Sequence, residues 1–177
     1  PLALTDDYLI CTRRLNKILS ISAHPPRITV EPGVTVGATL RAFKQHGVCL
    51  PMNVDLPTIT IGGAVAVGAN GFSKRWGTYS EFVEEVELVT GTGEIRTVHR
   101  ERDPELWRAV VCSLGLFGIF TKITLALQPA FNVRVVNRKI EMRQAIDEVA
   151  RTFETHDYAQ YFWFPFNQQV TLQTSDV

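Results

Sequence analysis

The chain has 177 residues, of which 45% are hydrophobic and 20% are charged, the balance of a globular protein with a buried core. Its 18 basic and 18 acidic side chains cancel, so the sequence predicts no basic surface for a nucleic acid. Apolar runs such as 115–120 are too short to cross a bilayer. Residues 1–8 lack the basic and apolar regions of a signal peptide, so we expect none at this position.

The three cysteines, Cys11, Cys49 and Cys112, are odd in number and widely spaced. No pair has the spacing of a zinc site, so the sequence predicts no metal centre. The apolar neighbours of Cys11 and Cys112 predict buried thiols. Unpaired cysteines favour a reducing, intracellular compartment, and the sequence does not indicate which one.

The chain is expected to begin with a hairpin and a helix. Alternating apolar and polar residues predict strands within 15–22 and 27–31, separated by a polar turn with two prolines. Thr35 then stands where a helix cap is expected. An apolar stripe at helical spacing follows it, and Gly47 ends the helix.

The stretch 57–77, PTITIGGAVAVGANGFSKRWG, contains five glycines among small residues. Glycine loses much conformational freedom on folding, so such a bare backbone indicates sharp turns or close approach to another surface. One interpretation is a turn before a tightly packed short helix at about 63–67. The other is a ligand site, since hydroxyls and exposed amides beside a helix start suit phosphate oxygens and flat rings. Composition alone does not separate the two.

A second hairpin and a long strand follow. Residues 82–90 and 94–98 alternate on either side of the turn Gly91-Thr92-Gly93. Asp103 and Pro104 predict the start of a helix that runs to about Val111. The segment 119–128 alternates strongly and is predicted to be a strand.

The chain changes character after Pro129. The pattern predicts a strand at 132–140, a helix at 141–155 with an apolar stripe, an aromatic strand at 158–166 and a hairpin partner at 170–174. Two or three strands are too few to bury a sheet face unaided. This region is therefore expected to open a second domain.

Common catalytic signatures are missing from the sequence. Ser113 does not stand in a GxSxG pattern, and neither glycine cluster has the spacing of a Walker loop or of GxGxxG. The GTGEIR segment at 91–96 lies in a hairpin turn, without a helix start after it. A nicotinamide-binding Rossmann fold is therefore disfavoured.

Four segments, in order, resemble the FAD-binding domain shared by the vanillyl-alcohol oxidase and p-cresol methylhydroxylase flavoenzymes. They are VEPGVTVGATLRAFKQHGVCLP, TITIGGAVAVGANG, VEEVELVTGTGEIRTV and DPELWRAVVCSLGLFGIFTKITLALQ. FWFPF at 162–166 is similar to the strand that opens the second domain of sugar-lactone oxidases. Within the family, gulono-, galactono- and arabinonolactone oxidoreductases are the nearest match.

The resemblance implies an α+β fold with a mixed or antiparallel sheet flanked by helices. It implies an FAD-binding domain at 1–129 and the beginning of a substrate (cap) domain at 130–177. The family's pyrophosphate loop would lie before Pro1, and its catalytic residues would follow Val177. We therefore expect a fragment of a flavoenzyme and assign no catalytic residue within the chain.

The resemblance also implies which residues contact FAD. Asn70-Gly71 departs from the family, which often has His-Gly or Thr-His there. The implied positions lie in and just before the TIGG segment, in the helix start after it and in the Gly-Ile step after the second helix: Thr58, Thr60, Ile61, Gly62, Gly63, Val67, Gly68, Gly71, Gly118 and Ile119.

The implied activity is oxidation of a hydroxyl-bearing carbon of a sugar lactone or related polyol. The electrons would pass to oxygen or to an acceptor protein, and neither a nucleic acid nor a transmembrane segment is expected. The alternative is a non-catalytic module with the flavoprotein fold, held in a larger assembly.

Overall fold

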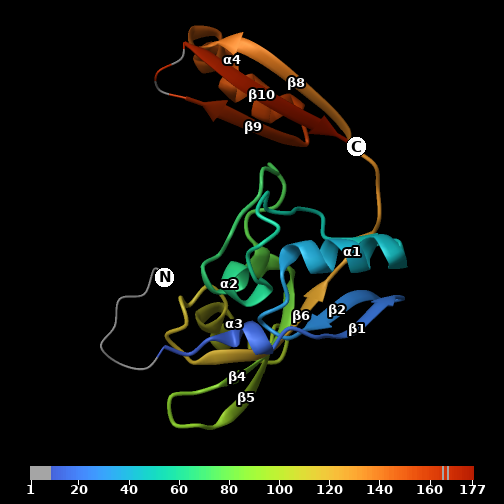
Figure 1. Cartoon of the computed structure of the whole chain (residues 1–177), viewed down its shortest axis with the longest axis vertical. Coiled ribbons are helices and arrows are strands. Elements are labelled where there is room, and N and C mark those ends of the chain that lie inside the picture. The colour runs from blue at the N-terminus through green and yellow to red at the C-terminus, as the bar shows by residue number, and fades with distance from the viewer. Residues whose placement is uncertain (1–8, 165, 167) are drawn as a thin grey trace.

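A computed structural model describes residues 9–164, 166 and 168–177. Within these residues the chain forms a five-stranded and a three-stranded antiparallel sheet, a two-stranded ribbon and four α-helices (Figure 1). This arrangement confirms the predicted α+β class. Residues 1–8 of the expected FAD-binding domain and Pro165 of the expected aromatic strand lie outside the described residues.

The five-stranded sheet contains both predicted hairpins. Its order is β1-β2-β6-β4-β5, and every neighbouring pair is antiparallel. Ile123 of β6 lies opposite Val30 of β2 and Val86 of β4, and all three are fully buried. The most strongly alternating strand of the sequence is therefore the centre of the sheet. The bounds are β1 Ile18–Ala23, β2 Pro26–Val30, β4 Val83–Val89, β5 Ile95–His99 and β6 Ile119–Ala126.

Helix α1 (Val36–His46) has the predicted ends. The Thr35 hydroxyl accepts a hydrogen bond from the Ala38 amide at 3.2 Å. Gly47 takes the left-handed backbone conformation, with φ 64°, that commonly ends a helix. Helix α1 lies against β1 and β3 (Val48–Cys49), and β3 pairs with β7 (Gln128–Pro129).

Two short helices differ from their predicted form. Helix α2 (Ile61–Ala66) begins two residues earlier than predicted, because the Thr60 hydroxyl caps it. Helix α3 (Pro104–Val110) follows Asp103 as predicted, but the Asp103 carboxylate accepts from the His99 amide at 3.1 Å and caps no helix amide. Two 3-10 turns, η1 (Thr12–Arg14) and η2 (Tyr79–Phe82), complete this part of the chain.

Two of the cysteine predictions are wrong, because Cys11 and Cys112 are exposed. Cys11 precedes the short turn η1, where its Sγ accepts from Arg13 Nε at 3.3 Å. The backbone of Cys112 has φ 63° in the turn after α3. Neither residue lies on a strand or helix face that would turn its side chain into the core.

The three-stranded sheet has the order β8-β10-β9, with β8 Arg134–Glu141, β9 Tyr158–Trp163 and β10 Gln169–Asp176. Helix α4 (Met142–Thr155) covers one face, where Leu172 is fully buried. Of the predicted apolar stripe of α4, Ala145 is buried, whereas Val149 and Phe153 are each 39% exposed. Strand β10 pairs antiparallel with β9, which confirms the predicted hairpin, and it also pairs with β8, so it is the centre of this sheet.

The three-stranded sheet lies at one end of the molecule and contacts the long connection between β3 and η2 (Figure 1). The Tyr158 hydroxyl donates to the Pro51 carbonyl at 2.7 Å, and the Ala159 amide donates to the Phe72 carbonyl at 3.1 Å. Lys74 Nζ donates to the Glu154 carbonyl at 2.6 Å. None of the described helices is both long and apolar enough to span a membrane.

Candidate functional site

The start of α2 is tied to the chain that precedes α1. The amides of Ile61 and Gly62 donate to the carbonyls of Val34 and Pro32, at 2.8 and 2.9 Å. The Gly63 amide donates to the Thr60 hydroxyl at 3.2 Å. The first amides of a helix lack partners within the helix and can bind an anion, but here the chain itself satisfies them. The expectation of exposed amides at this helix start is therefore wrong.

The exposed positions of α2 and its C-cap are Gly63 and Val67. Residues four apart lie on one helix face. Gly63 is exposed, and a Cβ built there would meet only the Thr60 hydroxyl, at 3.1 Å. Val67 is 58% exposed, whereas Ile61, on the other side, is fully buried. The helix thus presents bare backbone beside an apolar side chain, a surface that suits a flat ring.

Other glycines of the stretch face protein atoms. A Cβ on Gly62 would lie 2.6 Å from Pro32 Cβ, and one on Gly68 would lie 2.6 Å from Cys112 Sγ. A Cβ on Gly71 would collide with the Asn53 carbonyl and the Met52 sulfur. Close packing within the chain therefore explains these three glycines, and their contact with a cofactor stays a prediction.

Gly118 immediately precedes β6, which begins at Ile119. Gly118 has φ 139°, and a Cβ on it would lie 2.9 Å from the carbonyl carbon of Val89. Ile119 pairs with the same Val89 across the sheet. The sheet itself therefore requires glycine at position 118, and the expected contact of these two residues with FAD stays a prediction.

The turn before Gly118 meets the end of α2. The Leu114 amide donates to the Ala66 carbonyl at 2.9 Å. Leu114, Leu116 and Phe117 are 72%, 85% and 45% exposed. The glycine-broken turn that the sequence predicts at 114–118 is therefore present, and the structure joins it to α2. Its contact with α2 and the exposure of its large side chains were not predicted, because nothing in LGLFG indicates that they stay outside the core.

The two predicted threonines differ in their surroundings. Thr60 is half-buried, and its hydroxyl is committed to the cap of α2. Thr58 is exposed, and its hydroxyl has no hydrogen-bond partner within the described part of the chain. Thr58 is thus the one with a hydroxyl available to a ligand.

Tyr79 supports this region from within the core, and the sequence analysis did not predict this role. It is fully buried, and its hydroxyl donates to Asn53 Oδ1 at 2.6 Å. Burial raises the pKa of Tyr79 well above its ordinary value, so the hydroxyl remains a donor at neutral pH. Asn53 is thereby fixed, together with the carbonyl against which Gly71 packs. No sequence pattern connects these two positions.

Comparison with known protein families identifies the chain as an FAD-binding domain. The family model described as "FAD binding domain" matches residues 2–99, more than half of the chain, and the chain belongs to this family. The resemblance to the vanillyl-alcohol oxidase and p-cresol methylhydroxylase flavoenzymes is confirmed, and FAD is the cofactor of the family.

The curated relatives include several lactone oxidases. The chain is 27% identical over 172 residues to the D-arabinono-1,4-lactone oxidase of Eremothecium gossypii, which covers 95% of this chain and 32% of that protein. It is 30% identical over 178 residues to "Probable L-gulonolactone oxidase 4" of Arabidopsis thaliana, which covers 95% of this chain and 30% of that one. The chain thus spans about a third of the length of these relatives.

Solved structures agree on the fold. The cholesterol oxidase of Brevibacterium sterolicum superposes with a TM-score of 0.81 at 22% identity, over 92% of this chain and 34% of that one. A solvent-stable cholesterol oxidase gives a TM-score of 0.83 at 21% identity, over 96% and 36%. At this level of identity the likeness establishes the architecture alone.

The described surface fits a ring system of FAD better than it fits the diphosphate. The exposed backbone of Gly63 and the side chain of Val67 suit a ring system. The diphosphate needs hydrogen-bond donors, and the amides at the start of α2 are already engaged. These residues can therefore hold a ring of the cofactor by shape and apolar contact, and they do not supply a phosphate cradle.

Proposed function

We propose that the chain is the cofactor-binding part of an FAD-dependent oxidoreductase of the aldonolactone type. Its substrate is a sugar lactone or related polyol, oxidised at a hydroxyl-bearing carbon. Membership of the FAD-binding family supports the cofactor, and similarity to proteins named as lactone oxidases supports the substrate class. The structural observation on which the proposal depends is the bare, apolar face of α2 at Gly63 and Val67.

The reaction converts C–OH to C=O and removes two electrons and two protons from the substrate. Bound FAD supplies the two-electron acceptor, as flavin cofactors do. The electrons then pass to oxygen or to an acceptor protein. The contribution of the described residues is placement: α2 and the turn before Gly118 offer ring-sized apolar surface. We assign the base that takes the hydroxyl proton to none of them.

We divide the chain into an FAD-binding domain at 1–129 and the start of a substrate domain at 130–177. The separate sheets and separate buried clusters support this division. The described cysteines are unpaired, which supports an intracellular setting.

A second candidate function is a non-catalytic module with this fold. The observation that favours it is the set of engaged amides at α2, which leaves the diphosphate without donors there. One experiment separates the two candidates. Full-length protein is purified, scanned for the visible bands of oxidised flavin and mixed anaerobically with D-arabinono-1,4-lactone or L-gulono-1,4-lactone. Bleaching of the bands supports the enzyme, and protein without flavin even after incubation with FAD supports the module.

The same preparation distinguishes the electron acceptors. Reduced protein is exposed either to oxygen or to an artificial one-electron acceptor, and the return of the flavin bands is timed. Rapid return with oxygen indicates an oxidase, whereas return only with the artificial acceptor indicates a dehydrogenase that uses an acceptor protein.

A further inference from the structure

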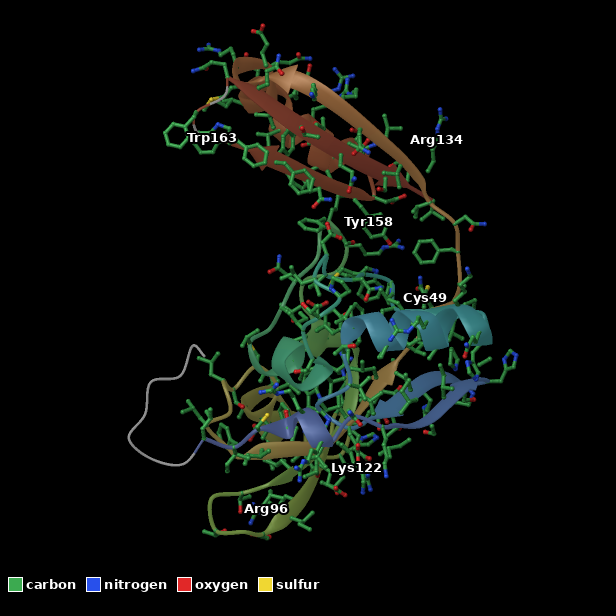
Figure 2. All side chains as sticks on the ribbon, viewed as in Figure 1. Cys49, Arg96, Lys122, Arg134, Tyr158 and Trp163 are labelled. Atoms are coloured by element: carbon green, nitrogen blue, oxygen red, sulfur yellow. The ribbon has the colours of Figure 1, made fainter. Side chains whose placement is uncertain are left out.

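A cavity of about 310 Å³ lies where the three-stranded sheet meets the connection after β3. Figure 2 shows Tyr158 between this sheet and the part of the molecule that contains Cys49, and both residues line the cavity. The hydrogen bonds from Tyr158 to Pro51 and from Ala159 to Phe72 hold its two walls together. Ligand pockets start at about this volume, which suits a molecule the size of a monosaccharide.

Gln160 and Gln173, which line one wall, belong to a row of amides that crosses all three strands. Gln160 of β9 and Asn137 of β8 each stand opposite Gln173 of β10. Gln160 Nε2 donates to Gln173 Oε1, and Gln173 Nε2 donates to Asn137 Oδ1 at 2.9 Å. At the other end of the row, Gln160 Nε2 also lies 3.3 Å from Asp55 Oδ2. The row thus links the sheet to the opposite wall.

This network determines which atom of the Gln160 amide group, the nitrogen or the oxygen, has no hydrogen-bond partner. A carboxylate such as Asp55 only accepts hydrogen bonds, and the amide nitrogen of Gln173 is committed to Asn137. The nitrogen of Gln160 must therefore face both neighbours. Its carbonyl oxygen has no partner among the described residues, although Gln160 is only 8% exposed. A buried acceptor without a donor is costly and calls for an explanation.

The opposite wall is largely apolar. Met52 is buried, Phe72 is 37% exposed, and Phe131 is half-buried. Among the described residues that line the cavity, Asp55 is the one with a charged side chain, and no lysine or arginine is present. The cavity therefore disfavours an anion. It suits a neutral molecule with an apolar face and with hydroxyl groups to donate.

We propose that this cavity binds a small, neutral, polyhydroxylated molecule, with hydroxyls donated to Gln160 and to Asp55. The Gln160 oxygen is closed to water, so binding requires the amide to turn toward the cavity. The turn breaks two contacts of the Gln160 nitrogen, the hydrogen bond to Gln173 Oε1 and the 3.3 Å contact with Asp55, which is long for a hydrogen bond. It thereby frees the acceptors of Gln173 and Asp55, which both line the cavity, for further hydroxyls of the ligand. This inference rests on the proposed function only in naming the ligand as the sugar-lactone substrate, and it makes Gln160 and Asp55 specificity-determining residues.

The test is anaerobic titration calorimetry of the full-length protein with D-arabinono-1,4-lactone and L-gulono-1,4-lactone, each beside its open-chain carboxylate. We expect the lactones to bind at least about tenfold more tightly than the carboxylates. Gln160→Met, which keeps the length and removes the acceptor, should weaken lactone binding about tenfold or more, the effect of one lost hydrogen bond to a well-placed ligand. Asp55→Asn removes the charge from an exposed position, so it should fold normally and reduce discrimination against the carboxylates.

The matched control is Gln144→Met on the exposed side of α4, where Gln144 pairs with Glu148 at 2.9 Å; it should leave binding unchanged. Failure of wild type to bind either lactone overturns the inference. Unchanged lactone affinity in Gln160→Met, or unchanged discrimination between lactone and carboxylate in Asp55→Asn, also overturns it.

The outcomes also separate this inference from the proposed function. Lactone binding that depends on Gln160 without flavin reduction supports the inference and contradicts the proposed function. Flavin reduction with the same KM in wild type and Gln160→Met supports the function and overturns the inference.

Discussion

Adding a side chain at Gly63 should weaken flavin binding while the fold survives. Gly63 lies on the open face of α2, and a Cβ there meets only the Thr60 hydroxyl at 3.1 Å. That hydroxyl must move by a few tenths of an ångström. This small steric cost is offset by helix propensity, because alanine stabilises a helix interior by about 1 kcal/mol relative to glycine. Gly63→Ala should therefore change the stability of the flavin-free protein by less than about 1 kcal/mol, or roughly 2–4 °C in Tm for a domain of this size.

The cofactor should respond differently. A methyl group keeps a flat ring away from the helix backbone, and the branched side chain of Gly63→Val keeps it further away. We expect flavin occupancy to fall from wild type through alanine to valine. Occupancy is measured as the visible flavin absorbance per protein in full-length preparations, with Tm measured after removal of FAD.

The control for this series is the neighbouring glycine. Gly62→Ala would place its methyl 2.6 Å from Pro32 Cβ, so it should lower Tm strongly in the flavin-free protein. Gly118→Val is not a useful probe, because its side chain would strike the Val89 carbonyl and disturb the sheet. If Gly63→Val retains wild-type flavin, the assignment of this face of α2 to the cofactor is wrong.

Two further predictions concern stability. Phe82 is 4% exposed and packs against Trp76 and Tyr79, with ring centroids 5.4 and 6.4 Å apart; Phe82→Ala should cost about 3–5 kcal/mol by denaturant titration, and a loss no larger than that of the exposed control Phe162→Ala would contradict it. The Asp176 pKa is held below its ordinary value by the hydrogen bond with His156 Nδ1 at 2.8 Å. The stability from this pair is therefore present above the unfolded aspartate pKa of about 3.9 and is lost as the pH falls through the folded value. Asp176→Asn should flatten that acid limb of the stability profile, and an unaltered limb would refute this role.

The regular elements could be predicted because their signals are local. Thr35 and Gly47 mark the ends of α1 through contacts within three or four residues. The hairpins follow from alternation and from a glycine turn. The central place of β10 could not be predicted in this way, because pairing with both β8 and β9 depends on residues up to 42 positions away.

The candidate site was less predictable, since its character depends on distant partners. Gly62 and Gly63 are adjacent and identical in sequence, yet one packs on Pro32 and the other faces solvent. The neighbouring sequence does not indicate which of the two glycines packs against another part of the chain. The same is true of Gln160, whose partners Asp55 and Gln173 come from different parts of the chain.

The engaged amides at α2 change how the cofactor must be recognised. A helix start with free amides attracts phosphate by charge and dipole, an attraction that weakens as salt rises. Here the carbonyls of Pro32 and Val34 occupy those amides, so α2 is a rigid part of the core before any ligand arrives. The exposed surface of the helix therefore recognises a ligand by its shape, because Gly63 has no side chain and Val67 has an apolar one. The contribution of this helix to binding should therefore depend on the fit of a ring and be insensitive to salt, and charge-dependent affinity for the diphosphate must come from groups other than these amides.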